Sequence, residues 1–389
     1  MTERYTCLFG GGAIRGIAYA GAVRALEEME ITYDIVGGSS VGSIIAALIA
    51  CGFNSDEIEA SFMDAGYELF RDIHFGLGKP LALSKGEIFT KWINDLITEK
   101  AGNLNEKKTC FKDIPQKLVI MTTDLNNFKP VEFSYCTAPD FEIARAVRIS
   151  SGMPGLMAPY EYGDLLLADG DLQKASPMWR LSATLNNSES RILEFRLEGA
   201  SNKNQNSPIS YINTIYSCVT DAATDFITEL YGNNDRYDCI KINTGDVFFA
   251  DLNLKKEERK KLINTGYEQT INYFKTVLPA KKRRLAAVYT AILSSLKKAQ
   301  KGLHSNNADE VSRHIGEMYV VLCENKEIID PLIYNNISLL KAELKKSVIS
   351  VLFFKARFKG LKRLEVQMAD TVHKLRARIA ELKFRTDSP

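Results

Sequence analysis

The stretch YDIVGGSSVGS, residues 33–43, contains the pattern G-x-S-x-G with Ser40 at its centre. This pattern is typical of a serine on a sharp turn between a strand and a helix, where its hydroxyl lies exposed at the helix N-terminus. The surrounding sequence fits, because an apolar strand candidate ends just before the motif and a helix-forming run, SIIAALIAC, follows it. Gly38 and Gly42 would keep the strand and the helix close together. We therefore predict that Ser40 is a nucleophile.

A nucleophilic serine needs a group that accepts its proton, and histidine is the usual one. The chain has four histidines: His74, His304, His314 and His373. The first lies in a helical insertion and the others in a helical C-terminal extension, so we expect none of them at the serine. An α/β-hydrolase places its serine after several strands, whereas only one strand candidate precedes the strand that carries Ser40. The malonyl-transferase type of acyltransferase needs a histidine in the middle of its chain, where this sequence has none.

A carboxylate is therefore the expected base, and Asp169 is the best placed. It ends the apolar run LLLAD and precedes Gly170, and catalytic residues of open α/β sheets gather at the carboxyl ends of strands. Burial would raise its pKa and make it a stronger base. Three other carboxylates compete on chemistry alone: Asp171, Asp124 and Asp34. The alternative for Asp169 itself is an aspartate of an ordinary Asp-Gly turn.

A glycine loop, GGGAIRG at residues 10–16, stands between a strand candidate and a helix candidate. Backbone N–H groups at such a helix N-terminus favour negative charge, so the loop suits either an oxyanion or a phosphate. A dinucleotide fingerprint needs glycines at i, i+2 and i+5, and neither Gly10 nor Gly11 starts that spacing; a P-loop sequence is also absent. We expect an oxyanion hole, with a nucleotide phosphate site and a purely structural turn as alternatives. The expected oxyanion-hole residues are Gly10, Gly11, Gly12 and Ala13, and the supporting motif residues are Arg15, Gly16, Gly38, Gly42 and Gly170.

The elements that must position these residues alternate between strands and helices. A strand at 5–9, a helix at about 15–29, a strand at 33–36 and a helix at 43–51 make two strand–turn–helix units. Such units predict an α/β fold with a parallel sheet. Further strand candidates are residues 117–125, 131–135, 164–171, 191–197 and 237–245.

The chain has 389 residues, of which 45% are apolar and 25% charged, as in an ordinary globular protein. This length allows one large domain and an extension. We predict a catalytic domain over residues 1–278, with a helical insertion at about 62–96, and a helical extension over residues 279–389. The net charge of +2 is too small to argue for a nucleic-acid partner.

The extension is the basic part of the chain. Residues 341–389 carry 13 basic and 5 acidic residues, a balance of +8 that leaves −6 for the rest. Residues 351–364 place apolar and basic side chains side by side, as a helix on a membrane surface would. A heptad seam is approximated by Leu361, Met368, Val372, Leu375, Ile379 and Leu382. These features predict a helical bundle packed on the catalytic domain or on a second copy, a membrane-binding surface, or a site for an activating partner.

The seven cysteines are scattered, with no C-x-x-C pair and no metal-ligand spacing. We interpret them as reduced packing residues and expect no metal and no cofactor. The N-terminal sequence lacks the features of a signal peptide, so the expected location is the cytoplasm, with peripheral membrane binding or another export route as alternatives. Residues 35–55 hold no charge and are long enough to span a bilayer, but their glycines and serines favour a buried strand, turn and helix.

The combination of G-G-G-x-x-R-G, a G-x-S-x-G about 25 residues later and a distant D-G without histidine resembles the patatin-like phospholipase family. Three further segments, MTTDLNNFKPVEFS, AVRISSGMPGLMAPY and YDCIKINTGD, are similar to segments of that family. The resemblance covers about residues 5–275. It implies a three-layer αβα fold with a mostly parallel central sheet. It also implies a Ca²⁺-independent lipid acyl hydrolase, with Ser40 and Asp169 at the family's two catalytic positions.

The resemblance implies hydrolysis of phospholipid or lysophospholipid esters, with Asp169 taking the proton of Ser40. Two departures from the family pattern stand near the base. Asp171 replaces the usual glycine or alanine, where it would either raise the pKa of the base or point to solvent, and Lys174 and Ala175 stand where asparagine is common. A catalytically silent relative that binds lipid or a partner through the extension is the alternative.

The insertion is rich in aromatic residues: Phe62, Tyr67, Phe70, Phe75, Phe89 and Trp92. They would form either an apolar mouth for acyl chains, with residues 76–79 as a mobile turn, or a core under a cap helix.

Overall fold

The computed structural model describes residues 4–65, 67–70, 72, 82, 84–100, 108–173, 191–199, 211, 214–216, 218–220, 222, 236–247, 254–305, 307–326, 328–349, 357–358 and 361–384. The chain divides into two compact units. The first comprises Met1–Gly232 and Tyr237–Tyr273, and the second, the extension, comprises Asn233–Arg236 and Phe274–Pro389.

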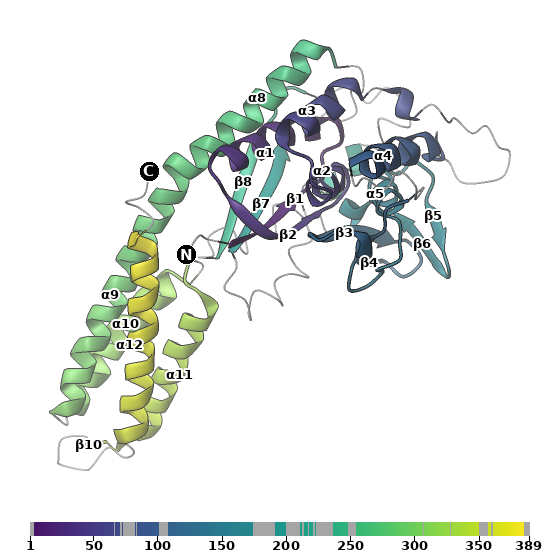
Figure 1. The fold of residues 1–389 in the computed structure, drawn as a ribbon. Helices are drawn as coiled ribbons and strands as arrows, with labels where there is room; N and C mark the ends of the chain where they lie inside the picture. Colours follow the sequence, from purple (N-terminus) through teal and green to yellow (C-terminus); the bar gives the residue numbers. More distant parts are fainter. Residues whose placement is uncertain are drawn as a thin grey trace. The chain divides into compact units, whose positions relative to one another are not determined.

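A mostly parallel sheet forms the centre of the first unit (Figure 1). Its parallel strands are, in spatial order, β3 (Lys117–Asp124), β2 (Thr32–Gly38), β1 (Arg4–Phe9), β7 (Arg191–Glu198) and β8 (Tyr237–Asn243). Nearly every residue of β1 and β7 is buried, as expected for strands covered on both faces. The predicted strands and the predicted parallel sheet are confirmed.

Three antiparallel strands extend the sheet beyond β3. They are β4 (Lys129–Ser134), β6 (Leu165–Ala168) and β5 (Tyr160–Tyr162). β4 pairs with one edge of β3 along most of the length of β3. β2 and β6 therefore both pair with the other edge of β3. Gly38 at the end of β2 pairs with Ile120, and Ala168 at the end of β6 pairs with Thr123. The two strands run toward each other, so the residues that follow them meet.

Two groups of helices form the outer layers of the three-layer fold. One group is α1 (Ala18–Glu28), α3 (Ser55–Asp64) and α8 (Lys256–Asn272), and the other is α2 (Val41–Ala50), α4 (Glu87–Lys100) and α5 (Ile143–Ser150). Short helical turns are η1 (Ala13–Ile17), η2 (Tyr67–Phe70), η3 (Phe111–Asp113) and η4 (Gly170–Leu172). A Cβ atom at Gly21 of α1 would lie 1.8 Å from the Ile263 carbonyl oxygen of α8, so the two helix backbones touch.

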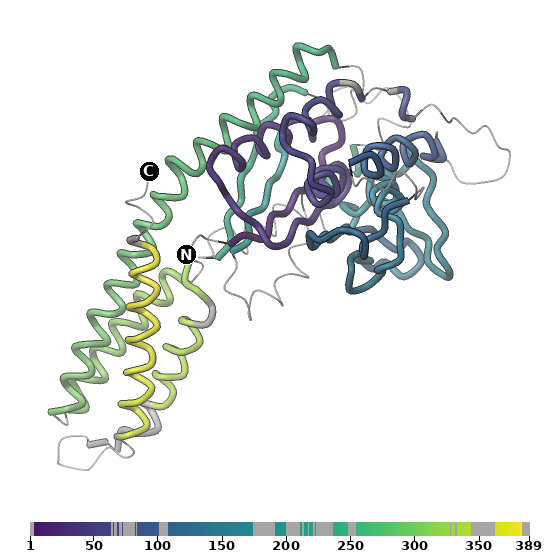
Figure 2. The backbone as a smooth tube through the Cα atoms, viewed as in Figure 1, coloured from purple at the N-terminus to yellow at the C-terminus, as the bar shows by residue number. Residues whose placement is uncertain are grey.

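The extension is a helical bundle with its own core. It begins within η5 (Tyr273–Val277), whose first residue still belongs to the first unit. Its helices are α9 (Leu278–His304), α10 (Ala308–Glu324), α11 (Pro331–Ser347) and α12 (Leu361–Phe384), and it has a short antiparallel pair, β9 (Val348–Ile349) with β10 (Arg357–Phe358). Figure 2 shows α9, α10 and α12 side by side. Met368, Val372, Leu375 and Leu382 of the predicted heptad seam are buried in this core. These seam residues therefore pack inside the extension and are not free to pair with a second copy.

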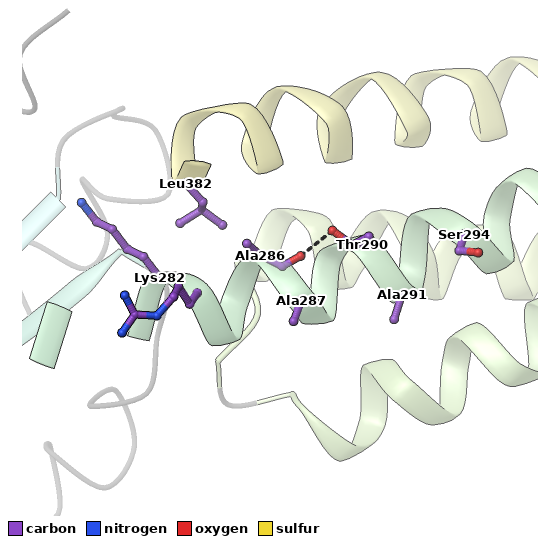
Figure 3. A pocket seen from close by; sticks show the side chains of 8 residues that line it. Lys282, Ala286, Ala287, Thr290, Ala291, Ser294 and Leu382 are labelled. Atoms are coloured by element: carbon purple, nitrogen blue, oxygen red, sulfur yellow. Dashed lines mark hydrogen bonds between the residues drawn. The ribbon is translucent and has the colours of Figure 1, made fainter. Parts of the chain in front are cut away.

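A groove of about 610 Å³ lies on α9 of the extension (Figure 3). It is lined by Lys282, Arg283, Ala286, Ala287, Thr290, Ala291, Ser294 and Leu382. The small side chains along α9 leave this space open. None of the residues of the serine motif or the glycine loop lines it.

The uncharged stretch at residues 35–55 forms the end of β2, the turn, α2 and the start of α3. None of the helices in the described ranges is long and apolar enough to cross a membrane. In the insertion, Phe62 and Phe89 are buried, and the Trp92 ring lies 5.8 Å from that of Phe89, which favours the core role for these residues. The side chains of the other three predicted aromatic residues and residues 76–79 lie outside the described part, and so does most of residues 351–364.

Candidate active site

Ser40 lies on the tight turn between β2 and α2. Its φ of 49° is in the left-handed region, which is uncommon for a residue other than glycine. A Cβ atom at Gly38 would lie 2.2 Å from the Gly42 carbonyl oxygen, and one at Gly42 would lie 2.0 Å from that of Phe9. Strand and helix therefore approach as closely as expected for the motif, and this packing holds the serine in its strained conformation.

The serine hydroxyl meets Asp169. Ser40 Oγ donates to Asp169 Oδ2 at 2.9 Å, and both side chains are buried. Asp169 Oδ1 accepts two other hydrogen bonds at 2.9 Å, from the backbone N–H of Asp171 and from the hydroxyl of Tyr216. The aspartate thus keeps its turn role through Oδ1 and presents Oδ2 to the serine.

Burial raises the pKa of Asp169 from 3.8 to about 6. Hydrogen bonds from the Asp171 backbone, Tyr216 and Ser40 act in the opposite direction, because they stabilise the carboxylate. The result is a carboxyl group that is ionised at neutral pH and yet accepts a proton more readily than an exposed aspartate. Such a group is suited to general-base chemistry.

The turn is held by serines of the S-S pair that ends α5. The Ser40 N–H donates to Ser150 Oγ at 3.0 Å, and Ser150 Oγ donates to the Met121 carbonyl oxygen at 2.6 Å. Ser151 Oγ donates to the Ser40 carbonyl oxygen at 3.2 Å. Hydrogen bonds to α5, and through Ser150 to β3, therefore fix the backbone around Ser40.

The glycine loop lies beside the serine, because a Cβ atom at Gly11 would be 3.0 Å from that of Ser40. The N–H of Gly10 donates to the Phe195 carbonyl oxygen at 3.0 Å, so Gly10 is not available as an oxyanion donor. The hydrogen bonds found among the described residues leave the N–H groups of Gly11, Gly12 and Ala13 unused. Gly12 and Ala13 have φ of 146° and 48°, which turns the backbone sharply before η1.

Asp171 does not point to solvent. Its side chain is buried and accepts a hydrogen bond from Ser39 Oγ. A Cβ atom at Gly11 would lie 1.5 Å from Asp171 Oδ2, so this carboxylate packs against the glycine loop. The backbone N–H of Asp171 donates a hydrogen bond to Asp169, and this bond lowers the pKa of Asp169.

The supporting motif residues have structural contacts. Arg15 Nε donates to the Gly12 carbonyl oxygen at 3.3 Å. A Cβ atom at Gly16 would lie 2.2 Å from Val41 Cγ2, and one at Gly170 would lie 2.2 Å from the Met121 carbonyl oxygen. These glycines allow the loop and the Asp169 turn to pack against the elements that flank Ser40.

The competing carboxylates lie elsewhere. Asp124 accepts hydrogen bonds from the backbone N–H groups of Asn126 and Leu166 and from the Asn127 side chain. Burial raises its pKa, but these bonds together outweigh burial and leave the pKa below its ordinary value. Asp34 is exposed at the start of β2, 3.7 Å from Arg4 Nη1. Neither is placed to serve Ser40.

Three of the four histidines lie in helices of the extension: His304 in α9, His314 in α10 and His373 in α12. His74, Lys174 and Ala175 lie outside the described residues.

Tyr216 and Ser150 were not predicted as site residues. Ser150 belongs to the segment AVRISSGMPGLMAPY, which is similar to a segment of the patatin-like family, so the resemblance could have indicated that it lies near Ser40. Tyr216 stands in a stretch without a motif, and only its tertiary contact with Asp169 distinguishes it from other tyrosines.

Residues 8–179 match the model of a family described as patatin-like phospholipase. This part of the chain is a patatin-like phospholipase domain. The match contains both Ser40 and Asp169. It ends before β7 and β8, which complete the parallel sheet.

Relatives of known sequence extend the comparison. The protein YqhO of Bacillus subtilis is 28% identical over 292 residues, which cover 69% of this chain and 97% of YqhO. The probable lipid hydrolase 463L of Invertebrate iridescent virus 6 is 26% identical over 180 residues, 44% of this chain and 61% of its own.

Among solved structures, VipD from Legionella pneumophila is similar over the whole chain. The TM-score is 0.55 at 15% identity, and the similarity covers 88% of VipD. At this identity the likeness concerns the fold alone, and it agrees with the predicted fold class.

Proposed function

We propose that this protein hydrolyses carboxylic ester bonds of phospholipids or lysophospholipids, with Ser40 as nucleophile and Asp169 as base. The observation that carries the proposal is the 2.9 Å hydrogen bond from Ser40 Oγ to a buried carboxylate whose pKa is raised to about 6. The patatin-like phospholipase domain supports a lipid as the substrate.

In the proposed acylation step, Ser40 Oγ attacks the ester carbonyl carbon while its proton passes to Asp169 Oδ2. The carbonyl oxygen becomes an oxyanion, which the N–H groups of Gly11, Gly12 and Ala13 stabilise. Each such donor is typically worth about 10²–10³ in rate. The intermediate then expels the alcohol, which takes the proton from Asp169, and the acyl group stays on Ser40.

In the proposed deacylation step, water attacks the acyl-serine ester and gives a proton to Asp169. Collapse of the second intermediate releases the fatty acid and returns the proton to Ser40 Oγ. Every step uses groups of the chain itself, so the proposed reaction needs no Ca²⁺.

The test is fatty-acid release from mixed phospholipid vesicles in the presence of EDTA. The vesicles include anionic lipid, because residues 341–389 carry a balance of +8 and we propose that they contact the membrane surface. We expect release by the wild type and a loss of at least about 10³-fold in Ser40→Ala and in Asp169→Asn. Asp34→Asn, an exposed aspartate outside the site, is the matched control and should retain wild-type activity.

Retained activity in either site variant would overturn the proposed pair. If the wild type releases no fatty acid from vesicles, micelles or lysophospholipid, the proposal fails in favour of a silent lipid-binding or partner-binding relative.

A further inference from the structure

Asp169 has a third partner that the two-residue mechanism does not use. Its buried carboxylate accepts hydrogen bonds from Ser40 Oγ, from the Asp171 N–H and from the Tyr216 hydroxyl. The first bond is the one through which a proton would move. The second comes from the backbone of the same turn, and the third comes from a residue 47 positions away.

Tyr216 belongs to a helical stretch in which residues 211, 214–216, 218–220 and 222 are described as helix. Thr220, one turn after Tyr216, is buried, whereas Ile215 and Val219 are exposed. The helix therefore has an inner face, which carries Tyr216 to Asp169, and an outer face. Such a placement from a separate element fixes the hydroxyl independently of the Asp169 turn.

We propose that Tyr216 is a positioning residue that completes a Ser40–Asp169–Tyr216 arrangement. By holding Oδ1, the tyrosine keeps the carboxyl plane turned so that Oδ2 faces Ser40. It also stabilises the ionised form of the Asp169 carboxylate in this buried site. The inference rests on the proposed function, in which Asp169 must be ionised to accept the serine proton.

Tyr216 is suited to this role because it stays a hydrogen-bond donor. Burial, followed by the charges of Asp169 and Asp171, raises the pKa of Tyr216 well above its usual value, so its hydroxyl keeps the proton. The groups whose hydrogen bonds lower the pKa of Asp169 are Ser40, Asp171 and Tyr216. Of these, only the Tyr216 side chain can be shortened by one oxygen without altering the serine or the turn.

The test compares Tyr216→Phe with wild type and with Tyr237→Phe. Tyr237 is a buried tyrosine of β8 that donates its hydroxyl to Glu194, so its variant loses a similar bond outside the site. In Tyr216→Phe we expect kcat to fall about tenfold at pH 7 and KM to change less than twofold. The acid limb of the pH–rate profile should move up by about one pH unit, because the carboxylate has lost a donor. Tyr237→Phe should leave the profile in place.

A second measurement does not depend on activity. The Asp169 carboxyl is titrated by NMR in protein labelled with ¹³C at aspartate Cγ, with Asp169→Asn used for assignment. We expect Asp169 to titrate at higher pH in Tyr216→Phe than in wild type and Tyr237→Phe. If Asp169 titrates at the same pH in all three, or if the titration moves while kcat does not, the positioning role is wrong. Failure of the proposed function would appear separately, as fatty-acid release that Ser40→Ala does not reduce.

Discussion

Asp169 illustrates the conflict between stability and chemistry at the scale of one residue. Its side chain is completely buried and its pKa is raised from 3.8 to about 6. Because the pKa of Asp169 is higher in the folded chain than in the unfolded chain, the favourable contribution of this side chain to stability is fully present below about pH 4. This contribution is lost as the pH rises through about 6. The ionised form that the proposed reaction needs is therefore the form that destabilises the fold.

Asp169→Asn should be more stable than the wild type at pH 7.5, because a neutral amide replaces a buried charge. Two pKa units correspond to about 3 kcal/mol, and mismatched hydrogen bonds of the amide will reduce the gain. Urea unfolding at pH 7.5 and at pH 4.5 measures the free energy of unfolding of both proteins. The gain should be largest at pH 7.5 and shrink at pH 4.5. If Asp169→Asn is less stable than the wild type at pH 7.5, the ionised carboxylate does not destabilise the fold and this prediction is wrong.

Ser40 and Asp169 could both be predicted from the sequence, but for different reasons. Ser40 stands in a local pattern that its own strand, turn and helix explain. Asp169 was found by elimination and by its place at a strand end. Tyr216 could not be found, because a tyrosine in a helical stretch has no local feature that indicates contact with a carboxylate 47 residues away.

At the scale of elements, the site depends on two strands that meet along one edge of β3. β2 runs parallel to β3 and pairs as far as Ile120, and β6 runs antiparallel and pairs from Thr123. The prediction for Asp169 used the rule for carboxyl ends of parallel strands. The location was right, but the direction of β6 was not part of the prediction. A four-residue strand carries no pattern that fixes its direction.

A substitution at Gly42 tests how closely α2 must approach the end of β1. In Gly42→Ala the new Cβ would meet the Phe9 carbonyl oxygen at 2.0 Å, and backbone cannot yield as a flexible side chain can. We expect a loss of about 3 kcal/mol or more in stability, with loss of activity. Gly316→Ala in α10, where nothing lies within 4 Å of the new Cβ, is the matched control and should gain up to about 1 kcal/mol. Thermal unfolding of both variants measures the difference; equal stability would mean that the turn has room to relax.

At the scale of the whole molecule, the chain combines a patatin-like phospholipase domain with a basic helical bundle. The sequence predicted the change from strands to helices. It left the use of the apolar seam open, because the same spacing serves an internal core and a coiled coil. The structure places Met368, Leu375 and Leu382 in the core of the extension. We propose that the basic side chains of residues 341–389, and not the apolar seam, contact the membrane surface.

The most direct measurement is the site of covalent modification of the full-length protein by a fluorophosphonate, read by peptide mass spectrometry. An activated serine forms a stable phosphonyl ester, so the proposed mechanism predicts one adduct, on Ser40. Labelling should be absent in Ser40→Ala and at least about 10²-fold slower in Asp169→Asn. The adduct on a different serine, or equal labelling rates in wild type and Asp169→Asn, would contradict the Ser40–Asp169 pair.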